Sequence, residues 1–373
     1  MITNRHYAQS VTNHFCKAPT LAAGNTWYKG TAVRNTYTAI HIVDTYTPTG
    51  NETETWNADV DDSGSIKCYV EGTTLTIVGN GHGRILANAD SSLAFGGNNS
   101  STRWSKVTEF TGLNYLDTRN ATTMERMFDG LFLVTTLDVG HFNTANCTNM
   151  YAMFNNCEQL LELDVSRFRT NLVTDMYAMF ADCTKIKKID VSRWNVSNVT
   201  NLNSVFYDCY ELEELDLSNF DLAGADNAGM MLYQCYALKN LKMKRSVSTK
   251  ATVMQAIFSS CTALESIDFS DFNTSSIAQM DYLFEDCSSL ISVDLSGFDT
   301  SSLTNASSMF TNCTSLTSVD LNNFNISVAG QGSMFNNCTA GLTIYVSDED
   351  AKIWAESKTS SLANVTVVIG KMP

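Results

Sequence analysis

The sequence of 373 residues predicts an α/β repeat fold, a curved solenoid of parallel strands and short helices. Three columns of residues carry this prediction. A large apolar residue recurs every 26 residues, with one shorter last step, a cysteine follows three residues after it, and an aspartate keeps the same register. The apolar column consists of Phe128, Phe154, Phe180, Phe206, Leu232, Phe258, Phe284, Phe310 and Phe335. One unit is too short to bury its own apolar face, so stacked copies must share a core.

Within each unit, the apolar spacing changes from a helical to a strand-like period. Apolar residues spaced i, i+3, i+4 and i+7 predict a helix of about two turns, and in one unit they are Met150, Met153, Phe154 and Cys157. Thr148 is its expected N-cap. Leu215 and Leu217 then alternate with polar residues, which predicts a short strand. Parallel strands pair at ~4.8 Å whereas packed helices need ~10 Å, so we expect the stack to bend with its sheet on the concave side.

The repeated unit resembles the BspA-like leucine-rich repeat, which is found in bacterial surface proteins and in proteins encoded by phages and prophages. The matching segments are MFNNCEQLLELDVSRF, MFADCTKIKKIDVSRWNVSNVTNL, LFEDCSSLISVDLSGFDTSSLTN and MFTNCTSLTSVDLNNF. The resemblance implies a leucine-rich-repeat solenoid of eight or nine units over residues 111–345. It also implies a role as an adhesion or recognition surface, and it brings no catalytic residue with it.

The two ends of the chain lack the repeat and are expected to close the core. Residues 1–110 predict a small, mostly β domain, with one strand in 39–47 and a hairpin that turns at Glu71 and Gly72. Residues 53–110 are also similar to segments that precede such repeats in phage-like proteins of gut bacteria, which implies a virion. Residues 346–373 predict a cap in which a helix starts at Ser347, with Asp350 three residues later, and a last strand follows.

The composition excludes several classes of function. Lys and Arg number 24 against 39 Asp and Glu, a net charge of −15, which argues against binding nucleic acid. No apolar run approaches the ~20 residues of a membrane span, so no membrane insertion is expected. The N-terminal residues show no charged region followed by an apolar one, so we expect no signal peptide.

The cysteine column allows a metal ladder, a chain of disulfides, or buried free thiols. Cysteines on helices ~10 Å apart would exceed the ~7 Å limit between Cα atoms of a disulfide. No pair has the spacing of a zinc site. Leu131 takes the cysteine's place in the first unit, where it keeps the packing but neither chemistry. We therefore expect buried thiols that act as small apolar groups.

The aspartate column raises the question of how stacked carboxylates are tolerated. Its members are Asp138, Asp164, Asp190, Asp216, Asp268, Asp294 and Asp320, with Lys242 in one place. A serine two residues after several of them can donate to the carboxylate, and Lys242 is expected to relieve repulsion between its neighbours. Calcium is the alternative, but it needs six to eight converging oxygens. We expect a structural ladder and no metal.

The fifth unit is irregular and contains the candidate binding residues. Lys242, Lys244 and Arg245, with Tyr233 and Tyr236 nearby, predict a basic, aromatic patch suited to acidic cell-wall polymers or charged glycans. Asp190, Asp216 and Asp268 of the neighbouring units complete this candidate surface, and degeneration of the repeat is the alternative interpretation. Exposed residues of two earlier units could extend it, namely Arg167, Arg169, Arg193 and Trp194.

No motif predicts catalysis. The segment DVDDSGS resembles the start of a calcium loop, but Val70 stands where a bidentate Glu is needed, so we expect a plain turn after Asp59. We therefore expect a non-enzymatic recognition or structural protein without a cofactor. The first setting is a phage or prophage virion, as a tail or fibre part that contacts the host, and the alternative is a bacterial cell-surface adhesin. Its expected partners are a protein or glycan on a cell surface and possible virion proteins.

Overall fold

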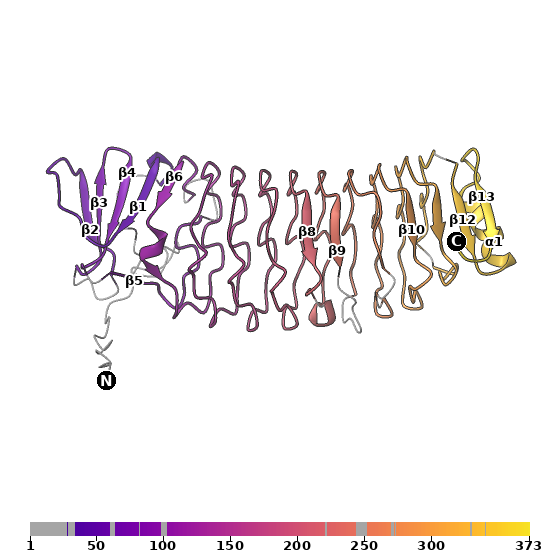
Figure 1. Cartoon of the computed structure of the whole chain (residues 1–373), viewed down its shortest axis with the longest axis horizontal. Helices are drawn as coiled ribbons and strands as arrows, with labels where there is room; N and C mark the ends of the chain where they lie inside the picture. Colours follow the sequence, from indigo (N-terminus) through magenta and orange to yellow (C-terminus); the bar gives the residue numbers. More distant parts are fainter. Residues whose placement is uncertain are drawn as a thin grey trace, which may run out of the picture.

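The computed structural model describes residues 28, 34–59, 64–81, 83–97, 103–220, 222–243, 252–269, 272, 274–328, 330–339 and 341–373. It shows a repeat fold of parallel strands with few helices. Coils lie side by side in a long row, with a β-sheet at the N-terminal end and a helix at the C-terminal end (Figure 1).

The N-terminal sheet has the strand order β2-β3-β4-β1-β6. Its strands are β1 (Ala39–Val43), β2 (Glu54–Asn57), β3 (Lys67–Glu71), β4 (Thr74–Val78) and β6 (Glu109–Thr111), and the short 3₁₀ turn η1 (Arg34–Thr36) precedes them. β3 and β4 pair in an antiparallel hairpin whose turn contains Gly72 at φ 58°, so the predicted hairpin is confirmed. Asp59 accepts hydrogen bonds from Gly64 N and Ser65 N, while residues 60–63 of the turn predicted after it lie outside the described residues.

One wall of the stack is built from short parallel strands, and we call it the strand wall. Partner residues in neighbouring coils are 26 apart, as in the bridge between Lys188 and Glu214, and 25 apart at the last pairing, Ser318 with Thr343. Its strands are β8 (Glu214–Leu217), β9 (Asn240–Met243), β10 (Ser292–Asp294), β11 (Ser318–Asp320) and β12 (Thr343–Val346). Two further short strands, β5 (Ile85–Leu86) and β7 (Leu116–Asp117), pair with each other in a separate ladder. The 3₁₀ turns η2 (Leu113–Tyr115) and η3 (Leu222–Gly224) lie between them. Leu215 and Leu217 are buried, which confirms the predicted alternation.

The other wall consists of tight turns, and we call it the turn wall; the helix predicted here is wrong for the described repeats. Ala152 and Asn156 have φ of 49° and 58°, a left-handed conformation that an α-helix does not contain. Met153 N donates to Met150 O within the turn at 3.2 Å, whereas Met150 N donates to Asp175 O in the next coil at 3.0 Å. The same apolar side chains are buried, but on a different backbone.

The turns solve a spacing problem that helices would create. A helix satisfies its N–H groups internally and needs ~10 Å to its neighbour, whereas the strand wall repeats at ~4.8 Å. Turns that direct alternate N–H groups to the next coil let both walls stack at a similar distance. The stacked rings of Phe154 and Phe180 have centroids 5.7 Å apart, and those of Phe284 and Phe310 5.5 Å. The predicted concave bend assumed that helices are spaced more widely than strands, and these turns are not. The coils run in a nearly straight row in Figure 1.

One buried cluster fills the space between the two walls. It runs from Tyr37 in the N-terminal segment to Ala355 in the C-terminal helix and includes the phenylalanine and cysteine columns. The core therefore continues across residues 110 and 345, and the division of the chain at these positions stays a prediction.

The C-terminal end closes the stack as a strand, a helix and a strand. β12 is followed by α1 (Glu349–Lys358) and by β13 (Thr366–Ile369), which pairs parallel with β12. The predicted cap at Ser347 is wrong, because α1 starts one residue later: Asp348 is the N-cap and accepts from Ala351 N at 2.9 Å. Among the described residues, no helix has the length and apolar character needed to cross a bilayer.

Candidate functional site

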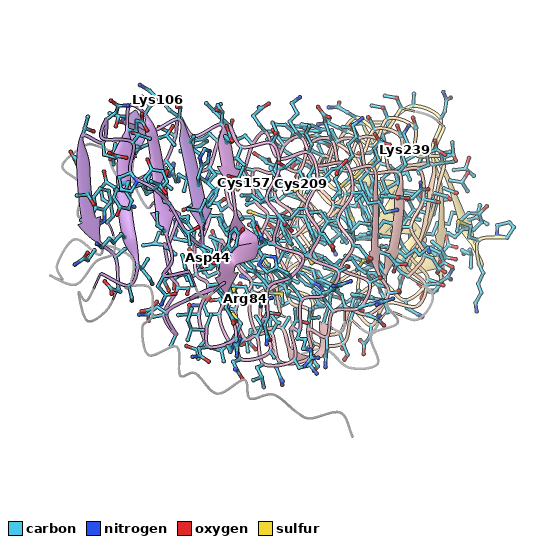
Figure 2. The ribbon with its side chains drawn as sticks, turned by 60° about the vertical axis from the view of Figure 1, so that its left-hand side comes forward. Asp44, Arg84, Lys106, Cys157, Cys209 and Lys239 are labelled. Atoms are coloured by element: carbon cyan, nitrogen blue, oxygen red, sulfur yellow. The ribbon has the colours of Figure 1, made fainter. Side chains whose placement is uncertain are left out.

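The cysteine column is part of the core. Each described repeat cysteine donates its thiol to a main-chain carbonyl of the preceding coil, as Cys157 does to Phe128 O at 3.4 Å and Cys287 to Phe258 O at 3.0 Å. Burial raises the pKa of these thiols, that of Cys261 to about 12. Figure 2 shows Cys157 and Cys209 among the side chains inside the stack. The prediction of buried thiols is confirmed, although the helices and the ~10 Å spacing used to argue it are wrong.

The aspartate column lies on the outer face of the strand wall and is held by its serines. Ser166 donates through its hydroxyl to Asp164 at 2.6 Å, and Ser192 donates in the same way to Asp190 at 2.7 Å. The main-chain N–H of Ser166 adds a second bond, and together they hold the pKa of Asp164 below its usual range. The predicted serine donors are therefore confirmed in these units. Asp268 lies in the same column, but Ser270 is outside the described residues.

Lys242 stands in the aspartate column beside Asp216. The two residues are paired in register on β8 and β9, and Nζ of Lys242 lies 3.4 Å from Oδ2 of Asp216. This is the neighbour that the sequence predicted for it. The lysine side chain is 75% exposed, so the pair adds little to stability. Lys244 and Arg245, the other cations of the predicted patch, lie outside the described residues.

The proposed extension of that patch is wrong at Trp194. Its indole is only 1% exposed, and Nε1 donates to Val165 O at 3.1 Å. It stacks between Phe168 and Phe220 of the neighbouring coils, so it belongs to the core. Exposed cations do remain on this part of the stack, namely Arg167, Arg169 and Arg193.

Tyr233 and Tyr236 belong to the turn wall, whereas Lys242 lies on β9 of the strand wall. Tyr233 lies within a turn and stacks on Tyr207 of the preceding coil, with ring centroids 5.0 Å apart and an interplanar angle of 11°. Tyr236 lies in the short turn that follows Cys235 and stacks on Tyr210, with centroids 5.1 Å apart. Sequence reasoning missed these partners, although each lies one repeat length earlier. The structure thus separates the predicted patch into a strand-wall part and a turn-wall part.

Two carboxyl groups complete the turn-wall part, which we call the tyrosine cluster: Tyr207, Tyr210, Tyr233, Tyr236, Asp182 and Asp208. Asp208 is 9% exposed; its Oδ2 accepts from the Tyr210 hydroxyl at 3.1 Å. Its Oδ1 has no hydrogen-bond partner among the described residues.

The electrostatics of the cluster are those of carboxyl groups without a counterion. Burial, opposed by the hydrogen bond from Tyr210 and supported by the nearby Asp182, raises the pKa of Asp208 to about 6. Burial also raises the pKa of Asp182, with Glu158 adding to the effect and Arg103 opposing it from beyond ion-pair distance. Burial and the hydrogen bond to Asp208 raise the pKa of Tyr210 to about 12. Within the described part of the chain, no lysine or arginine forms an ion pair with either carboxyl group.

Two hollows lie near the N-terminal end of the described stack. A polar pocket of about 360 Å³ lies where the N-terminal segment meets the first coils and is lined by residues that include Arg84, Asp117, Arg119 and His141. Arg119 pairs with Asp117 there. A second hollow of about 440 Å³ lies beside β6. Among the described residues, no three His, Cys, Asp or Glu side chains come together as metal ligands.

Comparisons with known proteins identify a repeat family. The family model described as "Mycoplasma protein of unknown function, DUF285" matches residues 99–189, 122–245 and 239–345, more than half of the chain. A crystal structure of a leucine-rich repeat protein from Eubacterium ventriosum is 15% identical, over 86% of this chain and 96% of that one, with a TM-score of 0.26. No curated protein matches. The resemblance to a repeat family is supported, and its BspA-like type stays a prediction.

Proposed function

The chain belongs to the family described as Mycoplasma protein of unknown function, DUF285, and from this premise we propose that it is a non-enzymatic recognition protein. In this proposal, the stack is a leucine-rich-repeat solenoid that presents its outer walls to a protein or glycan on a cell surface. The buried columns repeat because they build the scaffold, and the exposed positions vary because they carry the specificity.

The tyrosine cluster is the observation that carries this proposal. Tyr207 and Tyr233 are partly exposed at a repeat position that other coils fill with small or polar residues, namely Asn155, Ala181, Ser259, Glu285, Thr311 and Asn336. The stack therefore does not need tyrosine there. Tyrosine is enriched at protein interfaces because it offers a large apolar ring and a polar hydroxyl at low conformational cost. Four tyrosines beside two carboxyl groups suit a binding surface.

Two settings fit a long recognition array. The first is a phage or prophage virion, in which this chain is a tail or fibre component that contacts the host. The second is the surface of a bacterial cell, where the chain acts as an adhesin. Immunogold electron microscopy on the source culture distinguishes them, since label on particles favours the first setting and label on cell envelopes alone favours the second.

The recognition role is tested by adding the labelled full chain to intact host cells. We expect saturable binding that falls strongly in Tyr207→Ser/Tyr233→Ser. The matched control is Tyr151→Ser/Tyr177→Ser, a pair on the same wall with centroids 4.9 Å apart, in which Arg126 already covers the Tyr151 ring. Equal binding by both double variants would remove the tyrosine cluster from the proposal.

A further inference from the structure

The turn wall already contains one cation held between an aromatic ring and a carboxylate. The guanidinium carbon of Arg126 lies 5.2 Å from the centroid of the Tyr151 ring. Its Nη1 lies 2.7 Å from Oδ2 of Asp129, a carboxylate that is fully buried. Arg103 approaches the same carboxylate at 3.8 Å. This arrangement combines a cation–π contact with a charge-assisted hydrogen bond.

The tyrosine cluster has the same components without the cation. Asp208 supplies a nearly buried carboxyl group with one unpartnered oxygen, and the tyrosines supply aromatic rings next to it. A buried carboxylate without a partner is costly, and a cation that reaches it offsets that cost. The cluster is thus prepared for a positive charge that the described residues do not provide.

We propose that the tyrosine cluster binds the guanidinium group of an arginine in a basic segment of a partner protein. This inference rests on the proposed function and specifies the chemistry of its partner. The guanidinium pairs with Asp208 and lies against the tyrosine rings, as Arg126 does within the chain. Arginine suits the site better than lysine because its planar fork can stack on a ring and donate to a carboxylate at the same time.

The charge of the surface favours a basic protein over an acidic polymer. Asp182 and Asp208 both lie in the cluster, and the whole chain carries a net charge of −15. Phosphate or uronate groups would be repelled by these carboxylates. A neutral glycan would leave the buried carboxyl group without a counterion.

Binding should weaken at acidic pH. The titratable groups that face Asp208 are Asp182, Tyr207, Tyr210, Tyr236 and the buried thiol of Cys235, and the tyrosines and the thiol stay protonated over the range in question. Protonation of Asp208 below its pKa of about 6 removes the charge that the cation would meet.

The test is isothermal titration of the full chain with a short arginine-rich peptide and with the same peptide carrying citrulline. We expect the arginine peptide to bind and the citrulline peptide not to bind. Asp182→Asn/Asp208→Asn should weaken binding about tenfold or more. The control Asp164→Asn/Asp190→Asn removes the same charge from the strand wall and should change it by less than about twofold.

Three results would overturn the inference: equal binding of the two peptides, no binding of either, or equal loss in the two double variants. Circular dichroism of both variants shows whether the fold is kept. The proposed function has a separate outcome. If cell binding depends on Tyr207 and Tyr233 while the arginine peptide fails, the recognition role stands and its partner is a neutral protein or a glycan.

Discussion

The turn wall predicts a change in stability whose sign distinguishes turns from helices. Ser333 is an exposed residue at a left-handed position of the last turn, with φ of 58°. The left-handed conformation costs an L-residue ~1–2 kcal/mol, and Ser333→Gly removes that cost. Glycine loses ~0.5–1 kcal/mol more backbone entropy on folding. The net expectation is that the free energy of unfolding rises by about 0.5–1 kcal/mol.

The matched control is the same substitution in a true helix. Ser357 is exposed on α1, so Ser357→Gly should lower the free energy of unfolding by about 0.5 kcal/mol. Guanidinium unfolding followed by fluorescence gives the midpoint and slope for both variants. If Ser333→Gly destabilises the chain as Ser357→Gly does, the segment is helical and our explanation of the turn wall is wrong.

Four further predictions follow from the core and the two walls. Burial raises the pKa of the repeat thiols, that of Cys261 to about 12, so they should react with a thiol reagent only as fast as the chain unfolds. Rapid labelling of the native chain would contradict their burial. The pKa of Asp208 is about 6 in the folded chain and ordinarily 3.8, so the folded chain holds this proton more tightly than the unfolded chain does. The folded state therefore loses stability as the pH rises from 3.8 to about 6. Asp208→Asn should raise Tm at neutral pH and have little effect on Tm below pH ~4. Chelator should leave Tm unchanged, and a large fall in Tm with chelator would instead indicate calcium in the aspartate column. Lys242→Ala should lower the free energy of unfolding by less than about 1 kcal/mol.

The repeat columns could be predicted because burial repeats in the sequence, but the backbone conformation between them could not. Spacing of i, i+3, i+4 and i+7 reports which residues face the core and is equally compatible with helices and with these turns. A second signal was present. Gly130, Asn156, Asp182 and Asp208 occupy one left-handed position, and glycine, asparagine and aspartate are the residues that tolerate it best.

The candidate surface was predicted in part because sequence proximity does not tell one wall from the other. Tyr233 and Tyr236 were identified, but they were grouped with Lys242, which belongs to the strand wall on β9. Trp194 was taken as exposed, although it shares a column with Phe168 and Phe220 and is buried with them. In a repeat fold, the column of a residue predicts its burial better than its neighbours in sequence do.

The central claim is that coils stacked at the spacing of a β-sheet, with turns along one wall, support the binding surface. Far-ultraviolet circular dichroism of the full chain tests this claim most directly. The described residues contain one α-helix, α1, of 10 residues. The expected spectrum therefore shows strand and turn signal with little helix. A strong helical spectrum, as eight or nine short helices would give, would contradict the turn wall and with it the placement of the tyrosine cluster.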